Sequence, residues 1–342
     1  MAKKEKKVGL FLAQTAKIVD PIINRLLNLC VGKKFQGMVK YQINTGGKRI
    51  RPALAIASAK LFGGKTRDVL YPAAGLEILH NYSLIIDDII DNSFLRRGKP
   101  TVWAKFGRSI AQCIGIDFGA AIFQAANRSR YPVKTSEILA KTLKILVEGE
   151  ISDILFEQSG RKDEPYVVKN RYRNVSEKRY LEMVGKKTAS LFQSCCEIGA
   201  VSAGAKEKQI KALKNYGFNL GVAFQVKDDI LDIFGEGQKF GKKIGKDIQE
   251  GKMANAIICF AYQEFSQKEK KEFSQIIRKG VISDRDIRRA IILIKKTKAR
   301  EKAINYGERF IEKAKANLSL LPKNSWNRAL VDLCDIVIER EN

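Results

Sequence analysis

The feature that most constrains the fold is a set of long apolar-rich runs with the 3.6-residue period of an α-helix. The runs cover residues 70–90, 138–156, 176–203, 206–234, 253–265 and 303–321. Apolar residues at this period form the buried stripe of a helix. Alternating strand patterns with Asn-Gly or Asp-Gly turns are absent, and only 7 of the 342 residues are proline. The pattern therefore predicts an all-α chain of many helices.

The breaks between these runs are short. They are glycine-containing stretches at 46–47, 63–64, 97–100, 159–160 and 235–245, and none has the length of an inter-domain linker. We therefore expect a single domain over residues 1–342, in which the basic segment 1–7 can be disordered. The six cysteines show no zinc or disulfide spacing. No apolar run reaches the ~18 residues of a spanning helix, so we expect a cytoplasmic protein.

The chain is strongly basic, with 63 Lys and Arg against 37 Asp and Glu and a formal charge of +26. This charge is compatible with a nucleic-acid partner, with a solvated basic surface, or with a small acidic substrate. Zinc-finger spacing, an aromatic-studded RNA-recognition pattern and a basic region leading into heptads are all absent. The motifs below favour the small acidic substrate over nucleic acid.

Two acidic clusters follow apolar helical runs. The first reads Asp87-Asp88-Ile89-Ile90-Asp91, and the second reads Asp228-Asp229-Ile230-Leu231-Asp232. In each, the first and last aspartates stack on one helix face, where they repel each other unless a cation compensates. Such oxygen ligands suit Mg²⁺, which substrate phosphates then complete. A single cluster could be a solvated helix end; two clusters favour a metal site between facing helices of a bundle.

Two basic motifs accompany the acidic ones. Gly46-Gly47-Lys48-Arg49-Ile50-Arg51-Pro52 sets three cations beside a glycine pair that lets the backbone approach a phosphate. Arg96-Arg97-Gly98-Lys99-Pro100-Thr101 follows the first acidic cluster, where paired guanidinium groups can bind a diphosphate. Alone, each could be a basic surface turn.

Taken in order, the motifs resemble the trans-type isoprenyl diphosphate synthases of the polyprenyl synthetase family. The resemblance runs from about Gly46 to Gly251. Besides the four motifs above, it includes Glu77-x-x-His80, Ile116-Asp117, Lys187 to Phe192, Phe224-Gln225 before the second acidic cluster, Gly241-Lys242 with Gly245-Lys246-Asp247, and Gly251-Lys252. Within that family, the chain most resembles the short-chain geranylgeranyl and farnesyl diphosphate synthases. This resemblance implies the isoprenoid synthase fold, a helical bundle around a large central cavity in which two diphosphate pockets face each other.

The resemblance also implies the roles of individual residues. Asp87, Asp91 and Asp228 would hold Mg²⁺, three ions per site with Mn²⁺ as a substitute. The supporting carboxylates would be Asp88, Asp229, Asp232 and Asp247. The allylic diphosphate would meet Arg96, Lys187 and Lys242 (with Lys243 as a competitor), and Thr188 and Gln225 would face the carbocation. The isopentenyl diphosphate pocket would be Lys48, Arg51, His80 and Arg97.

The implied reaction is Mg²⁺-dependent condensation of isopentenyl diphosphate with dimethylallyl, geranyl or farnesyl diphosphate. A bulky Tyr82 followed by the small Ser83, five and four residues before Asp87, resembles the chain-length pocket of enzymes that make C20 products. We therefore predict geranylgeranyl diphosphate, with farnesyl or longer products as alternatives. By periodicity alone, Ser83 rather than Tyr82 points to the face of Asp87.

Three expectations complete the sequence-based account. The resemblance implies a homodimer without stable membrane insertion, although peripheral contact with a membrane remains open. Glu150 stands where the family commonly has Gln in a G-Q-x-x-D motif, which adds a negative charge near the expected metal region. The competing functions are a terpene cyclase and a non-catalytic basic helical binding protein.

Overall fold

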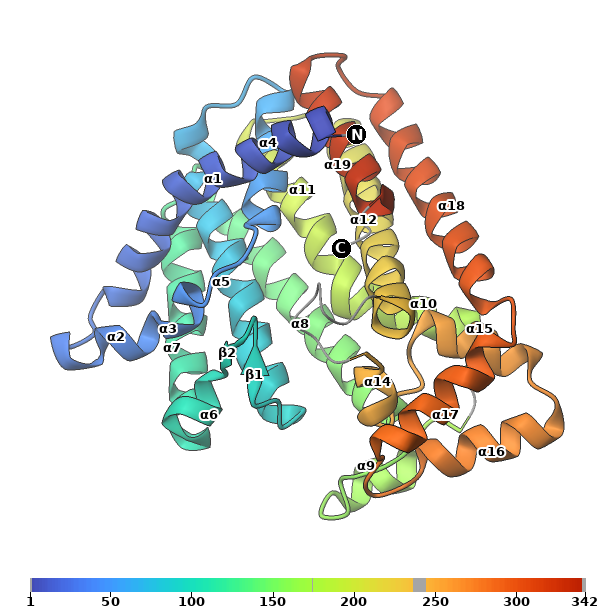
Figure 1. Ribbon diagram of the computed structural model, residues 1–342. Helices are drawn as coiled ribbons and strands as arrows, with labels where there is room; N and C mark the ends of the chain where they lie inside the picture. Colours follow the sequence, from blue (N-terminus) through green and yellow to red (C-terminus); the bar gives the residue numbers. More distant parts are fainter. Residues whose placement is uncertain (1, 174, 236–243, 340–342) are drawn as a thin grey trace. The chain divides into compact units, whose positions relative to one another are not determined.

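A computed structural model describes residues 2–173, 175–235 and 244–339. The chain forms two compact units, each described by itself below. Unit 1 comprises Met1–Lys144, Leu191–Phe218 and Ala314–Cys334, and unit 2 comprises Ile145–Ser190, Asn219–Lys313 and Asp335–Asn342. The described residues are almost entirely helical, which confirms the predicted all-α class (Figure 1). The single domain and the central cavity stay predictions.

The first part of the chain forms a run of helices and one small hairpin. Its elements are α1 (Ala2–Asn28), η1 (Lys33–Phe35), α2 (Gln36–Val39), α3 (Tyr41–Asn44), α4 (Ile50–Leu61), α5 (Thr66–Ile90), β1 (Leu95–Arg96), β2 (Lys99–Pro100), α6 (Val102–Phe106), α7 (Arg108–Asn127) and α8 (Pro132–Phe156). Residues 2–7, part of the basic segment for which we allowed disorder, belong to α1. The helix is anchored there, since Val8 is buried and Lys7 Nζ lies 3.4 Å from Asp332 Oδ2.

The rest of the chain is also helical. Its elements are α9 (Pro165–Asn170), α10 (Glu177–Val184), the π-helical turn η2 (Gly185–Ala189), α11 (Ser190–Ser202), α12 (Glu207–Phe234), α14 (Lys246–Gln249), α15 (Ala256–Glu264), α16 (Gln267–Ile277), α17 (Asp284–Lys295), α18 (Ala299–Ser319) and α19 (Ser325–Glu339). The helix expected over 176–203 is therefore interrupted by η2. The sequence did not predict this interruption, because a π turn does not change the apolar pattern on either side of it.

In unit 1, the 25-residue helix α5 packs against α1, α4 and α7. Gly75 allows the close approach of α7, since a Cβ there would lie 2.9 Å from the Ala125 Cβ. Nearly every residue of α5 from Val69 to Leu79 is buried. This packing fixes the end of α5 that carries the first acidic cluster.

In unit 2, α15 packs against α10 and α17, and α16 packs against α17. Capping boxes begin α16 and α17, where Ser266 and Ser283 each accept a hydrogen bond from the backbone three residues later. The rings of Phe265 and Phe273 lie 5.5 Å apart in the core beneath these helices.

One helix in the described part of the chain, α7, is long and apolar enough to cross a membrane by length and composition. The sequence reading overlooked it because polar residues such as Ser109, Gln112 and Asp117 interrupt its apolar run. About 44% of its most apolar window is buried in the protein, and core helices of soluble proteins meet the same criterion. It is weak support for a membrane span.

Candidate active site

The first acidic cluster ends α5. Asp87 lies in the last turn and Asp91 is the C-terminal cap, with its backbone N–H donating to the Asp87 carbonyl at 2.8 Å. Both side chains are therefore one turn apart on one face, as the spacing predicts, and both are half-buried. Asp88 points elsewhere and is 1% exposed.

Arg96 binds two members of this cluster from the β1–β2 hairpin. Its Nε lies 2.9 and 2.8 Å from the two carboxylate oxygens of Asp88, and its Nη2 lies 3.0 Å from Asp87 Oδ2. Burial alone would lower the pKa of Arg96, but the hydrogen bonds and charges of Asp88 and Asp87 raise it above its usual value. Asp88 thus holds Arg96 beside Asp87. We did not predict the hairpin, because two-residue strands show no alternating pattern.

An arginine cluster lies around His80 in the same unit. Arg97 forms the hairpin turn with φ of 55°, and its Nη1 donates to the Gly46 carbonyl. Gly47 has φ of 136°, a backbone conformation that strains any other residue, and its Cα lies beside the guanidinium groups of Arg49 and Arg97.

Burial and the nearby charges, Arg51 and Arg97 first, hold the pKa of His80 well below its usual value. His80 is therefore neutral at physiological pH. The structure thus brings together Arg51, His80 and Arg97 of the expected isopentenyl diphosphate set, and Lys48 is exposed on the adjoining loop.

The centre of this cluster is Arg49, which the sequence analysis assigned no role. Arg49 is 4% exposed, and its backbone has a left-handed φ of 52°. It donates to Asp20 of α1 at 2.6 and 3.2 Å, to Glu77 Oε1 at 3.4 Å and to two backbone carbonyls of the Ile43–Gly46 turn. Arg49 therefore ties α1, the glycine loop and α5 together. No local pattern signals this contact, because Asp20 lies 29 residues away in the sequence.

In unit 2, the π turn η2 presents Lys187 and Thr188. A Cβ at Gly149 of α8 would collide with the backbone of Lys187, so the glycine permits this turn to lie against α8. Lys187 Nζ lies 2.6 Å from Asp153 Oδ2 and 2.9 Å from Glu150 Oε2. The unusual Glu150 therefore has a cationic partner, and it shares Lys187 with Asp153.

The second acidic cluster lies in the last turns of α12 and divides into two kinds of side chain. Asp228 and Asp232 are half-buried, whereas Asp229 is 3% exposed. Asp229 accepts hydrogen bonds from Tyr180 Oη at 2.6 Å, Gln225 Nε2 at 2.9 Å and the backbone N of Ala256 at 2.8 Å.

Gln225 links Asp229 to Thr188. Its Oε1 accepts the Thr188 hydroxyl at 2.8 Å while its amide donates to Asp229. Asp229 thus fixes which way the Gln225 amide points, and Tyr180, 49 residues away in the sequence, is a functional candidate that sequence reasoning missed.

Unit 2 also brings together three carboxylates, the buried Asp229 and the half-buried Asp232 and Asp247. Burial and the charge of Asp247 raise the pKa of Asp229 to about 8. The same two causes raise the pKa of Asp232, and burial raises that of Asp247. Asp232 accepts from the backbone N of Lys246 at 3.0 Å and of Asp247 at 3.3 Å. Three mutually repelling carboxylates favour a bound cation.

These donors fit Mg²⁺. Each acidic cluster supplies carboxylate oxygens at one-turn spacing, which is the ligand type Mg²⁺ prefers. Within residues 2–173, 175–235 and 244–339, no three His, Cys, Asp or Glu side chains form a ready metal cage. Mg²⁺ commonly keeps bound waters and takes further oxygens from substrate phosphates. Lys242 and Lys243, expected at the allylic diphosphate, lie outside the described residues.

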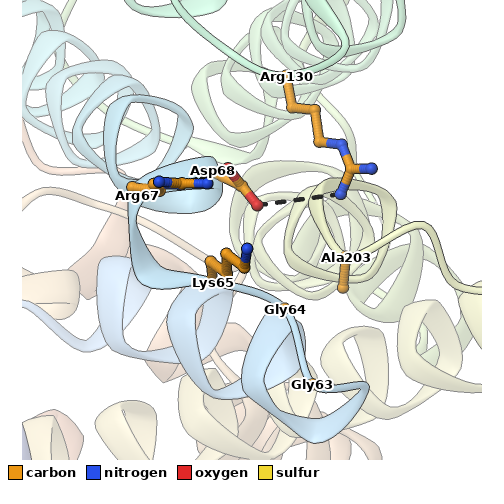
Figure 2. A pocket seen from close by; sticks show the side chains of 7 residues that line it. All are labelled: Gly63, Gly64, Lys65, Arg67, Asp68, Arg130 and Ala203. Carbon is orange, nitrogen blue, oxygen red and sulfur yellow. Dashed lines mark ion pairs between the residues drawn. The ribbon is translucent and has the colours of Figure 1, made fainter.

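Two of the cavities among the described residues of unit 1 bear on the predictions. The larger of these, about 340 Å³, opens at the start of α5 between Lys65, Asp68 and Arg130 (Figure 2), and its lining contains no predicted site residue. The smaller, about 50 Å³, is apolar and is lined by α5, α7 and α8 residues including Leu79 and Phe123. Tyr82, one turn after Leu79 on α5, packs its ring against Gly115 of α7, where a Cβ would lie 3.3 Å from Tyr82 Cε2.

We predict that Tyr180→Phe lowers kcat by about tenfold, because Asp229 loses one of its three donors and Gln225 loses its fixed orientation. Since this role is positional, the Mg²⁺ concentration for half-maximal rate should not move. Steady-state kinetics over a Mg²⁺ titration measures both values. Tyr262→Phe, which removes a hydroxyl 3.3 Å from Ser274, is the matched control. A shifted Mg²⁺ requirement with unchanged kcat would contradict the positional role.

Comparisons with known proteins identify the family of the chain. The Polyprenyl synthetase family model matches residues 32–294. A short chain isoprenyl diphosphate synthase from Methanocaldococcus jannaschii is 37% identical over 265 residues, covering 77% of this chain and 76% of the relative. A geranylgeranyl pyrophosphate synthase from Geoglobus acetivorans is 34% identical, covering 96% and 97%. The crystal structure of geranylgeranyl pyrophosphate synthetase from Pyrococcus horikoshii Ot3 superposes with a TM-score of 0.88 at 31% identity, covering 98% and 99%.

The all-α fold and its two aspartate clusters with neighbouring cations define a class of helical enzymes that act on diphosphate esters. Within that class, the chain belongs to the polyprenyl synthetase family, the trans-isoprenyl diphosphate synthases. The resemblance stated from the motifs is confirmed. The roles of individual residues stay predictions.

Proposed function

We propose that the protein is a Mg²⁺-dependent prenyltransferase that condenses isopentenyl diphosphate head-to-tail with an allylic diphosphate to make geranylgeranyl diphosphate. The observation that carries this proposal is that a candidate diphosphate-binding cation is tied to each aspartate cluster, directly in the first and through hydrogen bonds of neighbouring residues in the second. Arg96 lies against Asp87 and Asp88 in unit 1, and the η2 turn that presents Lys187 is joined to the α12 cluster through Thr188 and Gln225 in unit 2.

We assign the allylic diphosphate to these two sets of residues. Asp87, Asp91 and Asp228 would hold the Mg²⁺ ions, which when bound neutralise charge on the departing diphosphate. Arg96 and Lys187 would bind its remaining oxygens, and both already meet carboxylates at hydrogen-bonding distance in the structure. Asp88 would keep Arg96 oriented, while Asp229 and Gln225 would keep the Thr188 hydroxyl in place beside the developing carbocation.

The isopentenyl diphosphate would bind at Lys48, Arg51, His80 and Arg97. The allylic C–O bond breaks, the isopentenyl double bond supplies the electrons of the new C–C bond, and one proton leaves. The lowered pKa of His80 supports a neutral hydrogen-bonding role rather than a cationic acid. The released diphosphate is then the natural acceptor of the proton.

We assign the product length to Tyr82. Its ring lies on Gly115 of α7, and the small apolar cavity lined by Leu79 lies one turn further along α5. A chain growing along α5 would therefore stop at the ring. Farnesyl or longer products remain the alternative, and longer-chain synthases are also among the relatives.

Tyr82→Ala should lengthen the product by at least one isopentenyl unit, because the ring no longer separates the growing chain from the cavity beside Leu79. Reversed-phase chromatography of the dephosphorylated products measures the change. Ser83→Ala, which removes only a hydroxyl bonded at 2.8 Å to the His80 carbonyl, is the control. An unchanged product distribution in Tyr82→Ala would remove Tyr82 from the chain-length pocket.

We further propose that the chain acts as one catalytic domain, a homodimer in the cytoplasm. Exposed apolar side chains on α7 support a subunit interface, since Ile110, Ile116 and Phe123 are 40%, 74% and 66% exposed. Large apolar residues exposed together commonly mark such contacts.

One assay separates this function from its alternatives. Purified protein is incubated with Mg²⁺, labelled isopentenyl diphosphate and dimethylallyl, geranyl or farnesyl diphosphate in turn. A synthase incorporates label with at least one primer and yields linear prenyl diphosphates. A terpene cyclase would release unlabelled cyclic hydrocarbon, and a non-catalytic binding protein would leave every primer intact.

A further inference from the structure

The α16–α18 region of unit 2 carries a cationic surface that the proposed reaction does not use. Residues 267–302 contain thirteen Lys and Arg against five Asp and Glu. They form α16, α17 and the start of α18, with α16 packed on α17 (Figure 1). None of the predicted site residues lies in this segment. Its charge therefore calls for a separate explanation.

The cations gather on one face of α17. The exposed residues of this helix are Asp284, Arg285, Arg288, Arg289, Ile292 and Lys295, and Lys296 directly after it is exposed too. We call the five cations of this set, together with Ile292, the α17 stripe. The opposite face packs into the protein, with Ile287, Ala290, Leu293 and Ile294 all buried. Arg289 forms an ion pair with Glu272 of α16, and the charge of Lys296 helps to lower the pKa of Glu269 and of Glu272. The stripe thus presents a concentrated positive charge to solvent.

Two exposed apolar side chains accompany these cations, one within the stripe and one in the loop before α17. Ile292, at the middle of the stripe, is 49% exposed. Val281 is 87% exposed in the loop between α16 and α17, directly after Arg278, Lys279 and Gly280. Transfer of such an exposed apolar side chain from water into an apolar phase lowers the free energy.

We propose that the α17 stripe and the Val281 loop dock the protein on a membrane surface containing anionic lipid. Clusters of Lys and Arg on an amphipathic helix bind anionic headgroups, and neighbouring apolar side chains enter the acyl boundary. Nucleic acid fits less well, because single strands stack their bases on exposed aromatic rings. The only aromatic residue of 267–302 is Phe273, which is buried. This inference rests on the surface alone and does not depend on the proposed function.

The test is cosedimentation of the full-length protein with phosphatidylcholine vesicles, with and without phosphatidylglycerol. We expect binding only to the anionic vesicles. It should weaken strongly between about 0.15 M and about 1 M salt, over which the Debye length falls from about 8 Å to about 3 Å. Equal binding to neutral and anionic vesicles, or none to either, would overturn the proposal.

A charge-matched pair of variants locates the surface. Arg288→Gln/Lys295→Gln/Lys296→Gln should weaken vesicle binding by about a hundredfold, at about fivefold per cation removed. Lys206→Gln/Lys208→Gln/Lys211→Gln removes the same charge from exposed positions at the start of α12 and should bind like the wild type. Thermal unfolding checks that both variants fold. Equal loss in both would assign the binding to net charge and overturn the proposed surface.

The apolar part has its own variant. Val281→Ser keeps the charge and should weaken binding to anionic vesicles severalfold without changing its salt dependence. Unchanged vesicle binding by Val281→Ser, or loss of single-stranded RNA binding by the α17 triple variant with vesicle binding intact, would overturn the lipid assignment. Prenyl elongation is measured on the same samples without vesicles, so loss of activity and loss of docking are distinguished.

Discussion

Asp87→Asn should lower kcat by about a thousandfold or more, with thermal stability close to that of the wild type. Asp87 is half-buried at the end of α5 and accepts a hydrogen bond from Arg96 at 3.0 Å. The substitution keeps the size of the side chain and removes its charge. A proposed Mg²⁺ ligand is therefore lost, while the hydrogen bonds between Arg96 and Asp88 remain. Removing a single group that stabilises transition-state charge typically lowers kcat about 10²- to 10³-fold, and a metal ligand serves both metal and substrate.

The matched control is Asp68→Asn on the same helix. Asp68 lies in the first turn of α5, where Arg67 and Arg130 lie 3.7 and 3.9 Å from its carboxylate, and no prediction gives it a catalytic role. The Asp68→Asn variant should have the kcat of the wild type. Initial rates at saturating substrates measure both variants. An Asp87→Asn enzyme within tenfold of the wild type would remove Asp87 from the metal site.

Arg49→Met should destabilise the fold by about 3–5 kcal/mol, the range for a buried ion pair that loses one partner. Arg49 is 4% exposed and Glu77 is 2% exposed, so the substitution leaves the Glu77 carboxylate buried without its ion-pair partner Arg49. Burial already raises the pKa of Glu77, and Arg49 is the first of the charges that oppose this rise. Urea-induced unfolding measures the loss in free energy.

Two further variants test this explanation. Arg67→Met, at a side chain 78% exposed, should change stability little. Arg49→Met/Glu77→Gln should be more stable than Arg49→Met alone, because it also removes the stranded charge. A double variant that is less stable than the single one, or a single variant as stable as Arg67→Met, would contradict the role of Arg49 as the centre of the cluster.

The helices predicted from apolar periodicity are those whose pattern is broad and regular. The runs 70–90 and 206–234 correspond to α5 (Thr66–Ile90) and α12 (Glu207–Phe234) with small shifts at their starts. The helix α7 was missed because glycines and polar residues dilute its stripe. The π turn η2 was missed because the apolar pattern continues on both sides of it, and because its contact with Gly149, 38 residues from Lys187, leaves no local signal.

The same limit applies to the site. Asp87 and Asp91 could be placed on one face because their spacing alone decides it. The partners of Arg49 and Asp229 could not be predicted in this way. Asp20 and Tyr180 lie on helices far away in the sequence, and hydrogen bonds between such helices depend on tertiary packing. Sequence reasoning also treated all four supporting aspartates alike, whereas their partners in the structure differ. Asp88 binds Arg96 and Asp229 accepts from Gln225, while Asp232 accepts from backbone N–H groups and Asp247 from Asn255.

The most direct test of the central claim is the stoichiometry of diphosphate release against isopentenyl incorporation, with and without Mg²⁺. Protein stripped of metal by a chelator is given both substrates, and each quantity is followed in the same sample. A prenyl chain elongase releases one diphosphate for every isopentenyl unit incorporated, and both stop without Mg²⁺ and resume when it is restored. Diphosphate release without incorporation, or incorporation that persists without a divalent metal, would contradict the account.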